Sequence, residues 1–354
     1  MKRVVVIGAG QAGLSAAYHL RRSGLAPWDD YLILDGSPGP GGAWQFRWPS
    51  LTLKTVNGVH DLPGMEFAET LAAGADPGEV PASAAVPKYF AEYESRFALP
   101  VRRPAKVVVV VCDRGDHFSI ETSTDTIATR GLINATGTWE QPFVPRYRGM
   151  ETFAGRQLHT KDYRSAEEFR GKHVVVVGGG ISAVQLLDEI SLVTSTTWVT
   201  RREPVWLDRD FTPDVGREAV AMVEDRVRRG LPPGSVVSVT GLLLTPSLAA
   251  ARERGALERH PMFDRVTPTG VEWSDGTTVA ADVILWATGF RSALDHLAPL
   301  HLRGPGGGIT MTGRLATQVE RNPRIHLLGY GPSASTVGAN RAGRAAVQEL
   351  LTTV

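Results

Sequence analysis

The sequence predicts an α/β protein with two doubly wound parallel sheets, the second inserted in the first. A strand, a glycine-rich turn and a helix open the chain in "VVVIGAGQAGLSAAYHL", and the same succession returns in "HVVVVGGGISAVQLLDEI". These strands are continuously apolar rather than alternating, which is typical of parallel sheets covered on both faces. The C-terminal "RIHLLGYGPSASTVGANRAGRAAVQELL" reads as strand, loop and helix, which would return to complete the first sheet.

The length also favours two domains, because 354 residues is long for one core. We expect a first domain of residues 1–150 and 291–354 and a second domain of residues 151–290. The first should include strands in "KVVVVVC", "HFSIETS" and "RGLINATG". In the second, Asp275-Gly276 suits a hairpin turn.

A less regular stretch covers about residues 214–262. Here "REAVAMVEDRVRRG" and "PSLAAARERGAL" predict two helices separated by a break at "LPPGS". We interpret the stretch as a helical excursion from the second domain.

Composition excludes several function classes. The 38 basic and 37 acidic residues leave a net charge of +1, so no global field attracts nucleic acid or an anionic membrane. No apolar run approaches the roughly 18 residues of a membrane span. The nine histidines show no metal-ligand spacing, and no metal site is predicted.

The single cysteine, Cys112, rules out a disulfide framework, a thiolate zinc site and a CxxC redox pair in this sequence. A reducing, cytoplasmic compartment fits this usage best. Because Cys112 follows "KVVVVV", we expect a buried thiol at a strand end.

The first glycine turn carries a Rossmann-like dinucleotide fingerprint, formed by Gly8, Gly10 and Gly13. Gly8 permits a tight turn, Gly10 admits a pyrophosphate against the backbone, and Gly13 allows close helix packing. The helix N-terminus, at Gln11 and Ala12, offers free N–H groups to the phosphates. Asp35 ends the next strand, where its carboxylate can accept the ribose hydroxyls.

The second glycine turn has Gly178, Gly180 and Ala183, followed by Ile181 and Ser182 at the helix start. Its second strand ends in "VTRREP", so Arg201 and Arg202 stand where the first unit has an acid. Guanidinium groups there favour the 2′-phosphate of NADPH. The alternative is that the basic pair is only a solvated strand end.

Two dinucleotides in one chain suggest FAD in one site and a nicotinamide donor in the other. After Asp35 the chain continues as "GSPGPGGAW", and Gly36, Gly42, Ala43 and Trp44 could cradle a flavin. This favours FAD in the first domain. An ordinary loop with a packed tryptophan is equally compatible with these residues.

The chain resembles the class B flavin-dependent monooxygenases along essentially its whole length. The resemblance rests on both fingerprints, on "GGAW", on the two "ATG" segments and on the motif FxGxxxHxxx(Y/F), met by Phe153, Gly155, His159 and Tyr163. Tyr163 followed by Arg164 is similar to the N- and S-oxidising branch rather than the Baeyer–Villiger branch. The compact length resembles small bacterial FAD/NAD(P)-binding oxidoreductases, some of them linked to cation transport.

This resemblance implies that NADPH reduces FAD and that oxygen then forms a flavin C4a-(hydro)peroxide. The activated oxygen would be transferred to a small N- or S-nucleophile or a carbonyl compound. Two alternatives remain open: an NADPH oxidase or reductase that inserts no oxygen, and a redox-sensing flavoprotein associated with transport. The expected partners are a small-molecule substrate and O₂, with no nucleic acid or membrane insertion, and a homodimer is conceivable.

The resemblance also implies site residues. Asn57 matches a position where an amide approaches the flavin, although Asn57-Gly58 also suits a simple turn. His159 lies in the passage expected between the domains and could donate a hydrogen bond across their boundary. The remaining cofactor-binding candidates, beyond the two fingerprints and the "GGAW" loop, are Val107, Ala135, Thr136, Gly137, Ala287, Thr288, Gly289, Gly331, Ser333 and Ser335.

Overall fold

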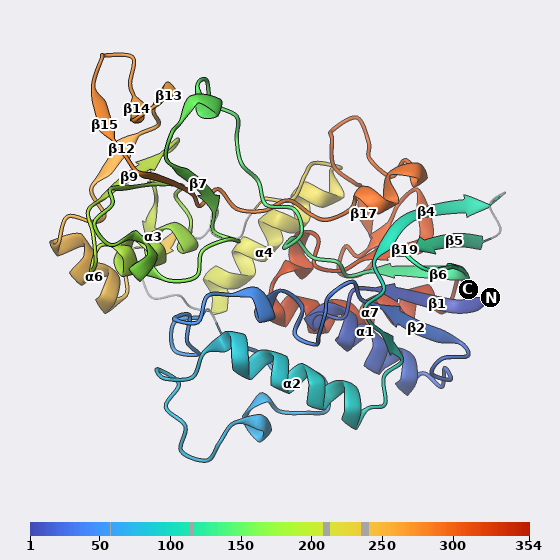
Figure 1. The fold of residues 1–354 in the computed structure, drawn as a ribbon. Helices are drawn as coiled ribbons and strands as arrows, with labels where there is room; N and C mark the ends of the chain where they lie inside the picture. The colour runs from blue at the N-terminus through green and yellow to red at the C-terminus, as the bar shows by residue number, and fades with distance from the viewer. Residues whose placement is uncertain (57, 114–116, 208–212, 235–240) are drawn as a thin grey trace. The chain divides into compact units, whose positions relative to one another are not determined.

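The computed structural model describes residues 1–56, 58–113, 117–207, 213–234 and 241–354 (Figure 1). The chain forms two compact units. Unit 1 comprises residues 1–140, 220–234 and 292–354, and unit 2 comprises residues 141–219 and 235–291. The predicted α/β class is confirmed, and unit 2 is inserted between parts of unit 1.

Unit 1 is built on a nine-stranded sheet. Its main path runs β17-β18-β19-β6-β1-β2-β3, and β4 and β5 form an antiparallel extension of β6. The strands are β1 Lys2–Ile7, β2 Tyr31–Leu34, β3 Val101–Arg102, β4 Val107–Asp113, β5 His117–Thr122, β6 Thr126–Asn134, β17 Met311–Thr312, β18 Gln318–Val319 and β19 Asn322–Leu327. The helices are α1 Gln11–Arg22, α2 Ala82–Arg96 and α7 Thr336–Leu350.

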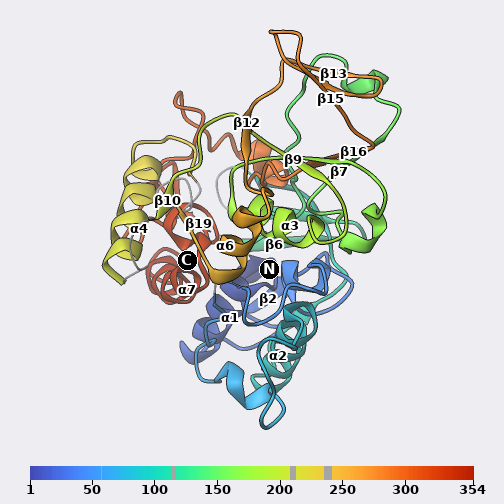
Figure 2. The same cartoon turned by 90° about the vertical axis from the view of Figure 1, so that its left-hand side faces the viewer.

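Both faces of this sheet are buried. Along β1, Val4 and Val6 belong to the core beneath α1, α2 and α7, whereas Val5 and Ile7 belong to a second core on the opposite face. This explains why the strand is continuously apolar. Helices α1 and α7 pack side by side (Figures 1 and 2).

The predicted return of the C-terminal segment is confirmed, because β19 pairs in parallel with β6. The three predicted strands before residue 140 are also present as β4, β5 and β6.

Unit 2 contains a five-stranded parallel sheet in the order β12-β9-β8-β16-β7 and a separate three-stranded sheet. The parallel strands are β7 Arg156–His159, β8 Val174–Val177, β9 Thr196–Thr200, β12 Arg259–Pro261 and β16 Val283–Trp286. The antiparallel strands are β13 Arg265–Thr267, β14 Gly270–Glu272 and β15 Thr278–Ala280, and the predicted turn lies between β14 and β15. Helix α3 spans Ile181–Ile190, and β10 Trp206–Leu207 pairs with β11 Leu242–Leu243.

The stretch of residues 214–262 contains the two predicted helices, α4 Pro213–Arg228 and α6 Pro246–Glu253. The units divide it, however: residues 220–234 belong to unit 1 and α6 belongs to unit 2. The reason is that Val227 of α4 is fully buried in the second core of unit 1.

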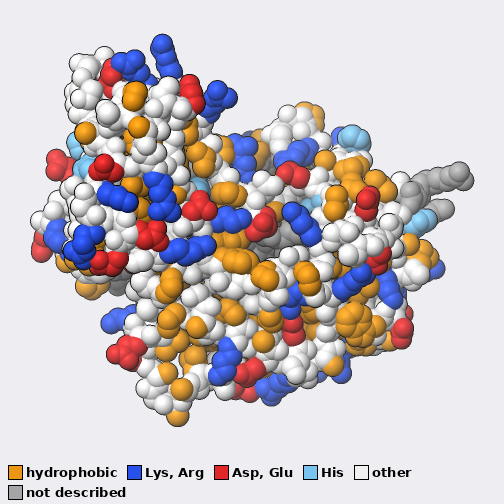
Figure 3. Space-filling view, in the orientation of Figure 1, with side chains coloured by type: hydrophobic (Ala, Val, Ile, Leu, Met, Phe, Trp, Pro, Cys, Tyr) orange, Lys and Arg blue, Asp and Glu red, His pale blue; other side chains and the backbone are white. Residues whose placement is uncertain are grey.

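Two further expectations concern the surface. Cys112 is exposed at the end of the β4–β5 hairpin, so its predicted burial is wrong; the apolar run continues past the last residues that the core covers. On the face drawn in Figure 3, basic and acidic side chains are interspersed, in line with the net charge. Within the described ranges, no helix is long and apolar enough to cross a bilayer.

Candidate functional site

The first glycine turn closes tightly between β1 and α1. Gly8 has φ +100°, and a β-carbon added there would lie 2.5 Å from the Ala135 carbonyl oxygen. A β-carbon on Gly13 would lie 1.9 Å from the Gly8 oxygen. At Gly10, in contrast, no described atom lies within 4 Å of an added β-carbon. The fingerprint therefore combines two packing glycines with one that faces open space.

Helix α1 begins at this open position. Gly10 is its N-cap, and no side chain of the described residues caps it. The N-terminal N–H groups of α1, beginning with those of Gln11 and Ala12, can therefore bind an anion.

Asp35 is buried at the end of β2, and two residues hold its carboxylate. Its Oδ1 accepts the Ser37 N–H at 3.2 Å, and its Oδ2 accepts Arg103 Nε at 2.8 Å. Arg103 also forms a bidentate pair with Glu94 of α2, at 2.9 Å for both bonds. Burial alone would lower the pKa of Arg103, but the Glu94 and Asp35 carboxylates raise it. The pairing fixes the orientation of the Asp35 carboxylate.

The loop after Asp35 approaches the glycine turn. A β-carbon on Gly42 would lie 3.1 Å from Gly10 Cα, and Gly42 begins the short helix η1 Gly42–Phe46, which includes Ala43 and Trp44. On the other side, a β-carbon on Gly36 would lie 3.3 Å from Cα of Lys106, the residue before Val107. Gly42 thus lies beside the glycine turn, and Gly36 lies beside Lys106.

Gln11 and Asn340 supply a test of whether FAD fits. Gln11 Nε2 donates to Asn340 Oδ1 at 3.1 Å and to the His60 carbonyl at 3.0 Å. Its Oε1 is buried and has no protein partner among the described residues. An unsatisfied acceptor beside an uncapped helix N-terminus and an open glycine suits the phosphates and hydroxyls of a dinucleotide. The residues present therefore fit FAD.

The first "ATG" segment, Ala135 to Gly137, ends β6 beside Gly8. Thr136 Oγ1 donates to the Ala293 carbonyl at 2.7 Å and accepts from Asn134 Nδ2 at 3.0 Å. His296 Nε2 donates to Asn134 Oδ1 at 2.8 Å. Burial lowers the pKa of His296 to about 4, so its ring is neutral at pH 7.

The C-terminal loop uses its two serine hydroxyls internally. Ser333 Oγ donates to the Tyr330 carbonyl and accepts from Gly329, whereas Ser335 Oγ accepts the Gly338 N–H as the N-cap of α7. Gly331 has φ +64° and packs against Val227. These residues shape the loop, which leaves its backbone to contact a cofactor.

The second glycine turn repeats the first. Gly178 has φ +142°, and a β-carbon added there would lie 2.2 Å from the Ala287 carbonyl oxygen. At Gly180 an added β-carbon has no neighbour within 4 Å in the part of the chain that is described. No described side chain caps α3, which exposes the N-terminus at Ile181 and Ser182, while Ala183 is fully buried. This turn also fits a dinucleotide.

Arginines gather where β9 ends. Arg201 and Arg202 are exposed, and the Arg202 carbonyl accepts Thr200 Oγ1 at 2.7 Å. Arg259, at the start of β12, donates from Nε to Thr200 Oγ1 at 2.9 Å. Arg259 is a third basic group at this strand end that the sequence pattern did not indicate.

The motif beginning at Phe153 lies within unit 2 rather than in a connector. Residues 156–159 form β7, which pairs with β16 from Val283 to Trp286. A β-carbon on Gly155 would lie 2.3 Å from the Asp282 carbonyl oxygen and 2.6 Å from the Phe153 ring. The backbone at residue 155 can therefore approach Asp282 and the Phe153 ring this closely only because the residue is glycine. Tyr163 is buried and stacks on Phe169.

His159 connects β7 to the second "ATG" segment. The Lys161 N–H donates to His159 Nδ1 at 3.1 Å, so the ring proton resides on Nε2, which donates to the Gly289 carbonyl at 2.9 Å. Burial lowers the pKa of His159, outweighing the Gly289 bond and Asp162, which raise it. Thr288 Oγ1 donates to the Phe143 carbonyl. A neutral histidine thus fixes this turn, and its bond lies inside unit 2 rather than across a boundary.

The remaining expectations concern Asn57 and metal binding. Asn57 lies outside the described residues. A metal centre is not expected, and no cluster of three or more metal-ligating side chains occurs in the described part of the chain.

The whole chain is similar to known flavin-dependent oxidoreductases. Residues 5–234 match the pyridine nucleotide-disulphide oxidoreductase family. A flavin-containing monooxygenase from Stenotrophomonas maltophilia is 38% identical, with a TM-score of 0.82 over 99% of both chains. The uncharacterized oxidoreductase CzcO of Bacillus velezensis is 26% identical over 83% of each chain. Indole-3-pyruvate monooxygenase YUCCA8 of Oryza sativa is 26% identical over 96% of this chain and 90% of its own.

The predicted resemblance to flavin-dependent monooxygenases is confirmed. The chain belongs to the pyridine nucleotide-disulphide oxidoreductase family and, within it, to the flavin-containing monooxygenases, so it is an NAD(P)H-dependent flavoprotein oxidoreductase that uses FAD.

Proposed function

We propose that this enzyme uses NADPH and O₂ to oxygenate small molecules at a soft nitrogen or sulfur, with carbonyl compounds as a second substrate class. The supporting observation is the pair of glycine turns with the same geometry and different surroundings. One is followed by a buried carboxylate, Asp35, and the other by exposed arginines. Two dinucleotides held by one chain are what electron transfer from a nicotinamide to a flavin requires.

In unit 1 we assign the FAD site to the turn around Gly10. The N-terminal N–H groups of α1 would bind the pyrophosphate, and Asp35 would accept the ribose hydroxyls. Arg103 would keep that carboxylate oriented. Bound FAD would supply the redox chemistry and the reaction with O₂.

In unit 2 we assign the NADPH site to the turn around Gly180. The N-terminus of α3 would bind the pyrophosphate, and Arg201 and Arg202 would bind the 2′-phosphate. His159 would act as a positioning residue, because its neutral ring holds the Gly289 carbonyl and so the course of the backbone.

We further propose a cytoplasmic location, supported by the single cysteine. Light scattering on the purified holoenzyme would test whether it forms a homodimer.

The decisive experiment measures NADPH, O₂ and hydrogen peroxide together, with panels of tertiary amines, thioethers and cyclic ketones. We expect at least one amine or thioether to be oxygenated, with less peroxide released than NADPH consumed. Peroxide equal to NADPH with every compound would instead identify an oxidase. Bound FAD with negligible NADPH turnover would favour the redox-sensing alternative.

A further inference from the structure

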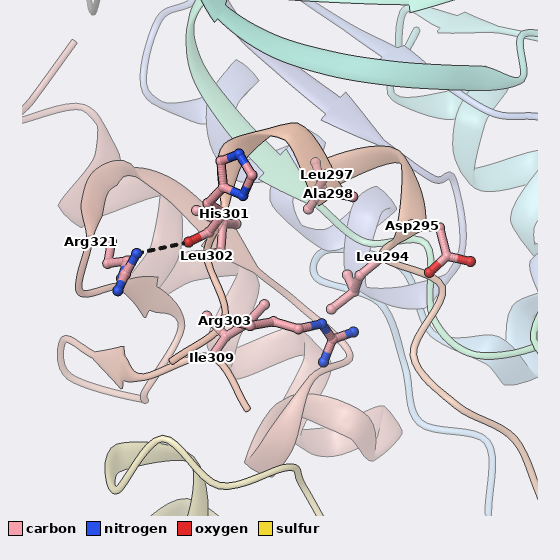
Figure 4. Close-up of a pocket in the computed structure, with 9 residues that line it drawn as sticks. All are labelled: Leu294, Asp295, Leu297, Ala298, His301, Leu302, Arg303, Ile309 and Arg321. Carbon is pink, nitrogen blue, oxygen red and sulfur yellow. Dashed lines mark hydrogen bonds between the residues drawn. The ribbon is translucent and has the colours of Figure 1, made fainter. Parts of the chain in front are cut away.

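A cavity in unit 1 is lined by none of the residues of the glycine turn between β1 and α1. Its volume is 260 Å³, and it is drawn in Figure 4. It is lined by the short helix η5 Asp295–Leu300, the segment that follows it, and the turn between β18 and β19. The volume is just below the roughly 300–1,000 Å³ of drug-sized ligand sites, so a smaller ligand is expected.

The lining combines an apolar floor with a cationic rim. Leu294, Leu297, Leu302 and Ile309 are buried and belong to the second core of unit 1. Arg303 and Arg321 lie at the rim and are exposed. In Figure 4 the Arg303 side chain extends toward Leu294, and the Arg321 guanidinium lies beside the His301 carbonyl.

Both guanidinium groups retain unused donors. Arg303 Nη1 donates to the Gly307 carbonyl at 3.2 Å, and Arg321 Nη1 donates to the His301 carbonyl at 3.0 Å. Neither forms an ion pair with a carboxylate of the described residues. Against these two cations the lining has one acid, Asp295. The rim therefore has a surplus of positive charge and of N–H donors suited to a carboxylate.

The backbone presents Arg303 from a fixed loop. The Gly304 N–H donates to Gly308, and the Gly308 N–H donates to the Gly230 carbonyl at 3.1 Å. A β-carbon on Gly308 would lie 2.3 Å from the Leu231 carbonyl carbon, so the loop packs directly on residues 230–232. At the end of the loop, the Ile309 N–H donates to the buried Tyr330 hydroxyl.

We propose that this cavity binds a small organic carboxylate. Its apolar part would occupy the leucine and isoleucine floor, and its carboxylate would bind Arg303, whose side chain extends toward Leu294, while Arg321 would add positive charge at the rim. The proposal does not depend on the substrate class given above.

The test is calorimetric titration of the FAD-loaded enzyme with hexanoate, and with hexanamide as a neutral probe of the same shape. We expect a hexanoate Kd on the order of 1 mM or tighter and at least about tenfold weaker binding of hexanamide. Arg303→Gln should weaken hexanoate binding about tenfold, and Arg321→Gln, which removes only a charge at the rim, should weaken it by less. Ala298→Trp, at an exposed lining position, should block the cavity without changing the core.

Two matched variants serve as controls. Arg314→Gln removes an exposed arginine outside the cavity, and Arg202→Gln removes one in unit 2. Both should bind hexanoate as the parent enzyme does. Absence of hexanoate binding, equal binding of hexanamide, or a loss confined to Arg202→Gln would overturn the proposal.

Discussion

Replacing one glycine in each turn would show which cofactor each turn binds. Gly10→Ala and Gly180→Ala each add a single methyl group at a position with negative φ, and no described atom lies within 4 Å of it. The protein itself should accept both changes, at about 1 kcal/mol or less for alanine as an N-cap. A dinucleotide pyrophosphate, however, must occupy that same space.

We therefore expect Gly10→Ala to lose about 2 to 3 kcal/mol of FAD binding, or roughly 100-fold in Kd, through weakened charge-assisted bonds to the N-terminus of α1. Gly180→Ala should keep FAD and lose NADPH affinity by a similar factor.

The assay is flavin absorbance per protein after desalting, followed by stopped-flow reduction at increasing NADPH. Thermal unfolding of the apoprotein tests whether the fold is intact. In contrast, Gly13→Ala should destabilise the protein with or without cofactor, because its β-carbon would lie 1.9 Å from the Gly8 oxygen. Full FAD occupancy in Gly10→Ala would refute the assignment of this turn.

Three further predictions concern single side chains. His159→Ala should slow flavin reduction by NADPH while FAD content stays unchanged, because alanine removes the bonds to the Gly289 carbonyl and the Lys161 N–H. Loss of FAD with normal kinetics in reconstituted enzyme would contradict this. Arg202→Gln should raise KM for NADPH about tenfold and leave KM for NADH unchanged, as steady-state kinetics with both donors would reveal. Burial in the folded protein lowers the pKa of His326 from 6.5 to about 4. The contribution of its neutral ring to the free energy of unfolding is therefore complete above pH 6.5 and is lost as the pH falls toward 4. Urea unfolding between pH 7 and 5 should show a pH dependence of the unfolding free energy that is shallower by about 1 kcal/mol per pH unit in His326→Asn than in the parent enzyme. Parallel curves would argue against this role of His326.

The sequence alone predicted the features that depend on residues close together in the chain. Both strand–turn–helix units, the hairpin at Asp275-Gly276 and the two helices between residues 213 and 253 are present as predicted. These features follow from apolar patterning and from glycines that pack against backbone. Gly155 also shows the close backbone approach that its place in the motif suggested.

What the sequence could not predict depends on distant contacts. Arg103 and Glu94 orient Asp35, and His296 reaches Asn134, but no local motif indicates these pairs. Arg259 joins the β9 end only because β12 lies beside it in the sheet. The same reasoning applies to α4, whose helical pattern was clear but whose Val227 contacts a core completed much later in the chain.

The pairing of β19 with β6 has a consequence for biosynthesis. Residues 132–134 of β6 pair with β1 on one side, but they obtain their partner on the other side only when residues 325–327 emerge from the ribosome, after all of unit 2 has been made. Until then the nascent sheet of unit 1 has an open edge, which is the kind of surface on which chains aggregate. Chains that stop within unit 2 should therefore be insoluble or bound to chaperones, and unit 1 should become protease-resistant last.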